Sequence, residues 1–112
     1  MDALTKNPPF SKDFRMVSQI KAAAGSVMDN IAEGFERGSR LEFINHLSYA
    51  KGSSGETRSQ LYRADDFEYI SEAEAQELIK EYESLAASIA NFIEYLNKST
   101  RKGQKFENRQ TL

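Results

Sequence analysis

Apolar and small residues recur at intervals of three and four along the first third of the chain, at Val17, Ile20, Ala24, Val27 and Ile31. This spacing places them on one face of an amphipathic α-helix, where they can pack against partner helices. The pattern predicts a helix over residues 12–33, with Ser11 as its N-cap. Gly34 follows directly, and a glycine there can end the helix in a left-handed turn.

A second helix is predicted over residues 40–64. Ser39 can cap its start, and Glu42, three residues later, completes a capping box. Its inward positions again follow steps of three and four: Phe43, Leu47, Ala50, Ser54, Thr57, Leu61 and Ala64.

Two interior glycines, Gly52 and Gly55, interrupt this second pattern. Each costs about 1 kcal/mol relative to alanine in a helix. We expect close contact with the Ala23–Gly25 stretch of the first helix to offset this cost. A kink or break near Gly52 is the alternative.

The third predicted helix, residues 72–97, has the clearest period. Ser71 and Glu74 form a capping box at its start, and Ile70 with Ala75 can form a hydrophobic staple. One apolar column comprises Ala75, Leu78, Tyr82, Leu85, Ile89, Phe92 and Leu96, and a second comprises Ile79, Ala86 and Ile93. Because the stripe is wider than a two-stranded seam needs, this helix should contact more than one neighbour.

Short connections between long helices favour an all-α, up-down antiparallel bundle. Before Pro8 and Pro9 only Met1–Lys6 remain for a first helix, so we expect a four-helix-bundle type with a truncated first helix. The predicted domain is residues 1–97, followed by a basic, mobile tail over residues 98–112.

Composition and charge narrow the possible functions. The chain has 112 residues and no cysteine, which excludes disulfides and thiolate chemistry, and its only histidine is His46. No Glu-x-x-His motif or nucleophile–base pair is present, so we expect no enzyme activity, metal or cofactor. No apolar run is long enough for a membrane span, which favours a cytoplasmic protein. Residues 64–97 carry nine Asp and Glu but one Lys, whereas residues 98–112 carry five Lys and Arg but one Glu.

The segment from Gln19 to Glu56 resembles the four-helix bundle family of 23S rRNA intervening-sequence proteins. The resemblance rests on Gln19-Ile20, Ala22–Ala24, Ser26, Asn30-Ile31-Ala32-Glu33-Gly34, Arg37, Glu42–Ile44, Ala50–Ser53 and Glu56, and covers about residues 5–97. It implies a bacterial, non-enzymatic scaffold or accessory protein that associates into a homopentamer. A related protein, the accessory variability factor of diversity-generating retroelements, binds nucleic acid and a reverse transcriptase. The family normally has a full helix before the position of Pro9.

The family-motif residues can be explained by structural roles. Ile31 belongs to the predicted core, Gly34 ends the helix, and Asn30 and Glu33 can hydrogen-bond to nearby backbone or a basic neighbour. Glu56, near Gly52, can pair with Gln19 or an arginine in a polar layer. The motif set comprises Gln19, Asn30, Ile31, Ala32, Glu33, Gly34, Gly52 and Glu56.

Binding of RNA or DNA is the alternative function, since Lys and Arg clustered on one face capture phosphates. Arg37 and Arg40 flank the first inter-helix turn. The other candidates lie at or beyond the end of the third helix: Lys98, Arg101, Lys102, Lys105 and Arg109. A solubilising tail, or one that contacts the acidic third helix of a neighbouring copy, is the other reading.

Overall fold

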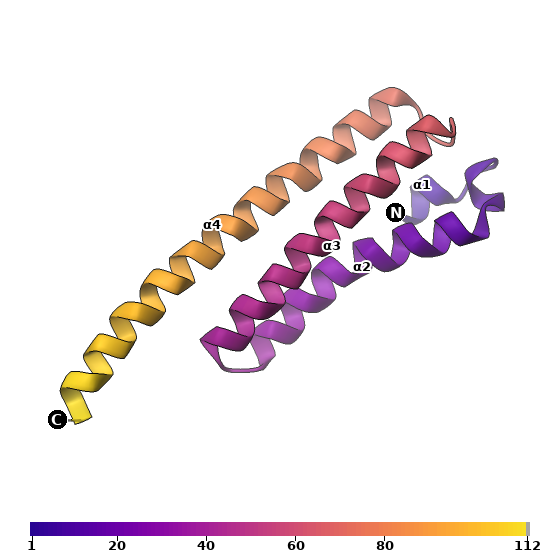
Figure 1. The fold of residues 1–112 in the computed structure, drawn as a ribbon. Helices are drawn as coiled ribbons and strands as arrows, with labels where there is room; N and C mark the ends of the chain where they lie inside the picture. Colours follow the sequence, from indigo (N-terminus) through magenta and orange to yellow (C-terminus); the bar gives the residue numbers. More distant parts are fainter. Residues whose placement is uncertain (112) are drawn as a thin grey trace.

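A computed structural model describes the backbone of residues 1–111 and the side chains of residues 1–99. The elements are α1 (Asp2–Thr5), a 3-10 turn η1 (Phe10–Lys12), α2 (Phe14–Glu36), α3 (Arg40–Asp66) and α4 (Glu72–Thr111). Within this part of the chain there is no strand, and the three long helices run up, down and up beside one another (Figure 1). The predicted all-α helical bundle is confirmed.

Helix α3 is the central helix, since it packs against α2 along one side and α4 along the other. Two apolar clusters fill the contacts. The first joins Phe10, Ile20, Leu61 and Ile79 near the N-terminal segment, and the second joins Val27, Leu47 and Ile89 towards the α2–α3 turn. The predicted inward face of α3 is correct from Leu47 to Ala64.

Helix α2 begins two residues later than the pattern predicts. Its N-cap is Asp13, not Ser11, and the Asp13 carboxylate accepts a hydrogen bond from the Met16 backbone N–H at 3.1 Å. Asp13 also accepts a bond from the Tyr69 hydroxyl at 2.8 Å, and Tyr69 stacks on Phe10 with ring centroids 5.2 Å apart. Asp13 therefore ties the start of α2 to the α3–α4 turn, a contact that local sequence could not reveal.

The predicted role of Gly34 as a helix terminator is wrong. Helix α2 continues through Gly34 to Glu36, and the residue with a left-handed backbone is Gly38, with φ of 73°. Gly34 is instead a buried helical residue packed against α3. The sequence does not distinguish a glycine that ends a helix from one that allows a close helix contact. Only the tertiary structure shows which role Gly34 has.

The N-termini of α3 and α4 are capped as predicted, to different extents. Ser71 and Glu74 form the reciprocal box, with the Glu74 N–H donating to Ser71 Oγ at 3.1 Å and the Ser71 N–H donating to Glu74 Oε1 at 3.3 Å. At α3, Ser39 Oγ accepts from the Glu42 N–H at 3.4 Å. The Glu42 carboxylate faces Arg37 at 3.9 Å, so only half of this box is formed.

The interior glycines of α3 neither break the helix nor approach α2. Helix α3 runs through Gly52 and Gly55 without interruption. A Cβ placed on Gly52, or on Gly25 of α2, would meet nothing within 4 Å. The predicted close contact between these stretches is therefore wrong, because the position that meets α2 is Ser53, one residue further around α3.

Helix α4 extends well beyond the predicted end at Asn97, to Thr111. Residues 98–111 contain no proline and many good helix formers, and their positive charge suits a helix C-terminus. Most of the predicted mobile tail, residues 100–112, has side chains outside the described part of the chain.

Candidate functional site

The family-motif segment of α2 contributes to a polar layer between α2 and α3. Asn30 Nδ2 donates to the Ser26 carbonyl oxygen at 2.8 Å and to Ser26 Oγ at 3.0 Å. Ser26 Oγ lies 2.8 Å from Ser53 Oγ, and Asn30 Oδ1 lies 3.2 Å from His46 Nδ1. Because the Asn30 amide nitrogen is the donor to Ser26, its oxygen remains as acceptor, so the network requires a proton on His46 Nδ1. The layer fixes the register of α2 on α3.

Gly34 lies one turn beyond Asn30 and allows the two helices to meet. A Cβ on Gly34 would stand 2.5 Å from the Cβ of His46 and 3.1 Å from Cδ1 of Phe43. The Asn30-to-Gly34 motif thus combines a hydrogen-bonding residue with a close-approach residue, four positions apart on one helix face. This arrangement supports a structural role for both residues.

Glu33 faces the solvent side of the same contact. Its carboxylate accepts a hydrogen bond from Arg37 at 2.8 Å, and Arg37 also approaches Glu42 at 3.9 Å. The Arg37 hydrogen bond, reinforced by the nearby His46, lowers the pKa of Glu33, and Glu33 in turn raises the pKa of Arg37. This cluster joins the end of α2 to the start of α3.

The expected polar layer around Glu56 is absent from the described part of the chain. Glu56 is exposed and Gln19 half-buried, and neither side chain has a hydrogen-bond or ion-pair partner among the described residues. The polar layer that does form uses Ser26, His46 and Ser53, which the prediction of site residues omitted. The spacing of Ser26 and Asn30, four residues apart on the inward face, was the available signal. Of the remaining motif residues, Ile31 is half-buried, and Ala32 and Gly52 are exposed.

Two of the three basic candidates whose side chains are described have carboxylate partners. Arg37 is held by Glu33 and Glu42, and Lys98 pairs with Glu94 at 3.2 Å. Arg40 is exposed at the first position of α3. The predictions for Arg101, Lys102, Lys105 and Arg109 concern side chains outside the described residues.

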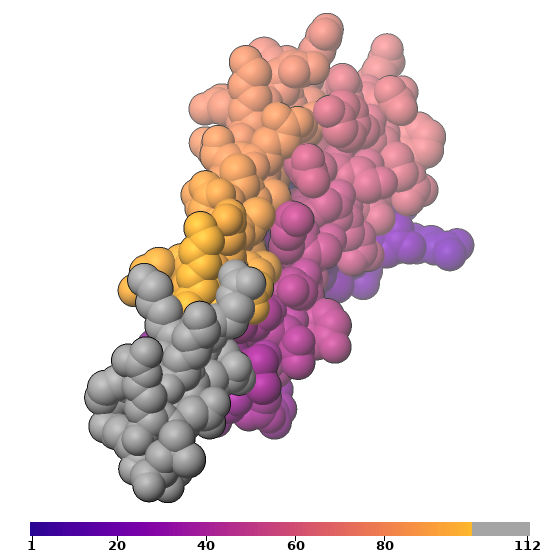
Figure 2. Space-filling model, turned by 60° about the vertical axis from the view of Figure 1, so that its left-hand side comes forward, coloured from indigo at the N-terminus to yellow at the C-terminus, as the bar shows by residue number. Residues whose placement is uncertain are grey.

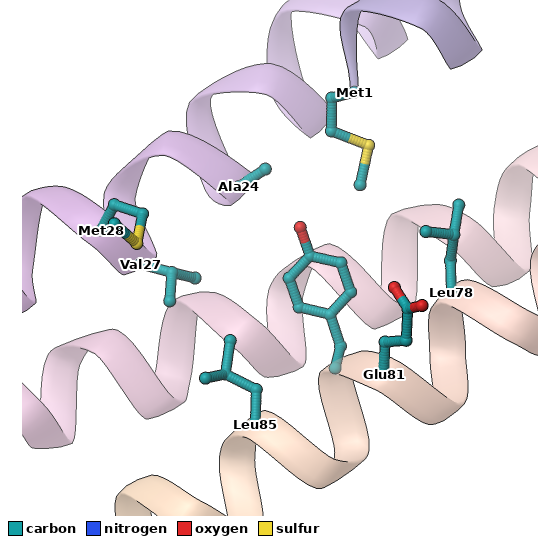
Figure 3. A pocket seen from close by; sticks show the side chains of 8 residues that line it. Met1, Ala24, Val27, Met28, Leu78, Glu81 and Leu85 are labelled. Carbon is teal, nitrogen blue, oxygen red and sulfur yellow. The ribbon is translucent and has the colours of Figure 1, made fainter.

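An apolar groove of about 290 Å³ lies between α2 and α4, where α1 is too short to cover them. Figure 3 shows Ala24, Val27 and Met28 of α2 facing Leu78, Glu81 and Leu85 of α4, with Met1 closing one end. Tyr82 also lines the groove, and its partial burial, with the neighbouring Glu81 charge, raises the pKa of its hydroxyl.

A row of aromatic side chains lies near the α2–α3 turn and draws on all three long helices. Phe35 meets Phe43 edge-on with centroids 6.0 Å apart, Phe43 meets Phe92 at 5.6 Å, and Phe92 meets Tyr95 at 6.3 Å. Phe35, Phe92 and Tyr95 are 68%, 44% and 65% exposed. The exposure of Phe92 corrects its predicted place in the core. We call Phe35, Phe43, Phe92 and Tyr95 the aromatic row.

Within the described residues, no group of three or more His, Cys, Asp or Glu side chains is placed to hold a metal ion. No helix in that part of the chain is long and apolar enough to cross a membrane.

Comparison with known proteins gives one match. The sequence model of the family described as 23S rRNA-intervening sequence protein matches residues 1–91, which include the polar layer, Gly34 and every residue that lines the groove. No curated protein and no solved structure matches the chain.

Proposed function

The chain belongs to the 23S rRNA-intervening sequence protein family, and from that premise we propose that it is a non-enzymatic, self-associating helical scaffold. The aromatic row carries this proposal. Its side chains form an unbroken series of ring contacts, yet Phe35 and Tyr95 remain largely in water and Phe92 is 44% exposed. Contiguous exposed apolar surface of this kind is typical of protein interaction sites.

The apolar groove also supports self-association. Met28, 69% exposed, lines the groove on the same helix as Phe35. Full burial of one large apolar side chain contributes roughly 1.5–3 kcal/mol. Covering Met28 and the exposed members of the aromatic row would thus supply several favourable contributions, against an association cost of at least about 4 kcal/mol. A second copy is the proposed cover, and by family resemblance the closed assembly is a pentamer.

Light scattering coupled to size exclusion tests this proposal directly. At micromolar concentration we expect a discrete mass of several chains, and of five if the family resemblance extends to stoichiometry. An interface held by apolar burial persists at high salt. A single-chain mass across the accessible concentration range would refute the scaffold.

Binding of RNA or DNA remains the competing proposal. Ion pairs at Arg37 and Lys98 weigh against it, because these two cations already have carboxylate partners. Fluorescence anisotropy with labelled single-stranded and double-stranded RNA and DNA would decide. Binding that weakens steeply with salt and is lost on removal of residues 98–112 would favour the competing proposal, and absence of binding at low salt would exclude it.

A further inference from the structure

A second surface, distinct from the groove and the aromatic row, lies between α3 and α4. The two helices run side by side on this face (Figure 2). A hollow of about 620 Å³ between them is lined by Ser48, Lys51, Gly52, Gly55 and Arg58 of α3, and by Ala90 and Ile93 of α4. Its walls are small or apolar, and its charged groups are two cations.

Neither cation has a counter-charge within the described part of the chain. The ion pairs between described side chains include neither Lys51 nor Arg58. Arg58 is half-buried, and its Nε is shielded from solvent with no hydrogen-bond acceptor among these residues. Shielding the Nε–H of Arg58 from water without an acceptor is unfavourable. The isolated chain therefore leaves this site electrostatically incomplete.

The glycines shape the site. Arg58 Nη2 lies 3.5 Å from the position that a Cβ on Gly55 would occupy, so the guanidinium folds back along α3 towards Lys51. Gly52 has open space where its Cβ would be. A helix can therefore approach the α3 backbone closely here, which gives a reason for two glycines inside an unbroken helix.

The same chain carries the complementary charge on α4. Glu77 and Glu81 are exposed, and neither has a cation within ion-pair distance among the described side chains. They stand four residues apart on one face of a helix, where like charges repel. Glu74 is engaged in the capping box and Glu94 with Lys98. Glu72 and Glu83 are also exposed and unpaired among these residues, but only Glu77 and Glu81 stand one helical turn apart. Glu77 and Glu81 thus form an unneutralised acidic pair on one face of α4, where Glu81 also borders the apolar groove.

We propose that the hollow receives, from a second copy, the face of α4 that carries Glu77 and Glu81, so that these two carboxylates meet Lys51 and Arg58. The spacing matches. Because Arg58 folds back over Gly55, its charge lies level with a position four residues from Lys51, about 6 Å along the helix axis. The same rise separates Glu77 from Glu81 on α4. Because hollow and acidic pair are different surfaces, they can pair head to tail, and a head-to-tail contact can close into a ring. This inference rests on the proposed self-association and names one of its contacts.

Charge exchange tests the contact. The variants are Lys51→Glu with Arg58→Glu, Glu77→Lys with Glu81→Lys, and all four changes in one chain. Lys12→Glu with Arg15→Glu is the matched control, since both residues are exposed and lie outside the hollow. Solution mass is measured by light scattering over a concentration series, and helix content by circular dichroism. A milder Arg58→Gln variant provides the same test if the double reversal at the hollow unfolds the chain.

We expect each double reversal at the contact to weaken association at least about tenfold, since like charges facing each other across an interface are strongly unfavourable. The four-change variant should recover association, and the control should behave as wild type. Wild-type association that survives both double reversals would overturn this contact and leave the scaffold proposal standing. A monomeric wild type would overturn both.

Discussion

Gly34 of α2 lies directly against His46 of α3, so that a Cβ on Gly34 would stand 2.5 Å from the His46 Cβ. Real Cβ atoms do not approach so closely. The obstructing atom is attached to the α3 backbone and cannot rotate away, unlike the tip of a flexible side chain. The absence of a side chain at position 34 therefore sets the distance between α2 and α3 beside the polar layer.

Gly34→Ala should lower the free energy of unfolding, because forcing an extra group into a packed contact usually costs about 1–3 kcal/mol. The higher helix propensity of alanine offsets up to about 1 kcal/mol of this cost, so the net loss in the free energy of unfolding should be up to about 2 kcal/mol. Urea denaturation followed by circular dichroism would measure the change.

Gly25→Ala is the matched control on the same helix. Gly25 is exposed, and nothing lies within 4 Å of its Cβ position. The only expected effect is the higher helix propensity of alanine, so the free energy of unfolding should rise by up to about 1 kcal/mol. A stabilising Gly34→Ala would contradict the close-approach role of Gly34.

Asn30→Ala removes the bonds to Ser26 and the acceptor that faces His46 Nδ1. We expect a loss of about 1 kcal/mol or more in the free energy of unfolding, because the partly buried His46 Nδ1–H loses its acceptor and Ser26 loses the hydrogen bonds that it accepts from Asn30. Asn45→Ala, at an exposed position of α3, should change it by less than about 0.5 kcal/mol. Equal effects at the two positions would mean that the polar layer contributes nothing specific to stability.

Asp13 should make stability sensitive to acid. The Met16 N–H and, after it, the Tyr69 hydroxyl hold the pKa of Asp13 below its ordinary value of 3.8. Since the folded-state pKa is the lower one, this stabilisation is fully present above the unfolded-state pKa. It is lost as the pH falls through the folded-state pKa.

Asp13→Asn keeps an oxygen for capping but removes the titrating group. Its stability should fall less steeply than that of wild type on acidification from about pH 5 to pH 2, as thermal unfolding would show. Asp29→Asn, at an exposed position without a described ion-pair partner, should retain the wild-type slope. Parallel profiles for all three proteins would exclude Asp13 as a source of acid sensitivity.

Replacing two members of the aromatic row, Phe35→Ala with Tyr95→Ala, should reduce association while changing the fold little, since both side chains are mostly in water. Phe14→Ala is the control, because Phe14 is 80% exposed and lies outside the aromatic row. Sedimentation velocity over a concentration series would separate the variants. If the Phe14 variant dissociates as readily as the double variant, the aromatic row is not the interface.

Much of the fold could be predicted from sequence. Periodicity and capping chemistry act within a few residues of the chain. They correctly predicted the inward residues of α3, the starts of α3 and α4, and the reciprocal cap at Ser71. Predicted helix ends were less accurate. The true start of α2 depends on Asp13 also bonding to Tyr69, more than fifty residues away.

The candidate site depended more on tertiary structure. The sequence pattern singled out Asn30 and Gly34, and it predicted a polar layer in which Glu56 pairs with Gln19 or an arginine. In the structure Asn30 contacts Ser26 and His46, and Glu56 is exposed. The sequence alone does not distinguish a glycine at a helix end from one at a close helix contact or one beside a hollow. Gly38, Gly34 and Gly52 occupy these three situations here.

The amino-acid sequence by itself determined that this protein is a bundle of long amphipathic helices, because helical periodicity and caps are local properties. Tertiary structure alone decided which residues complete the α2–α3 contact and which aromatic rings stay exposed. It also left Lys51 and Arg58 without a described counter-charge. Those outcomes depend on how three helices rotate and approach one another, and that geometry is set by the sum of all their contacts.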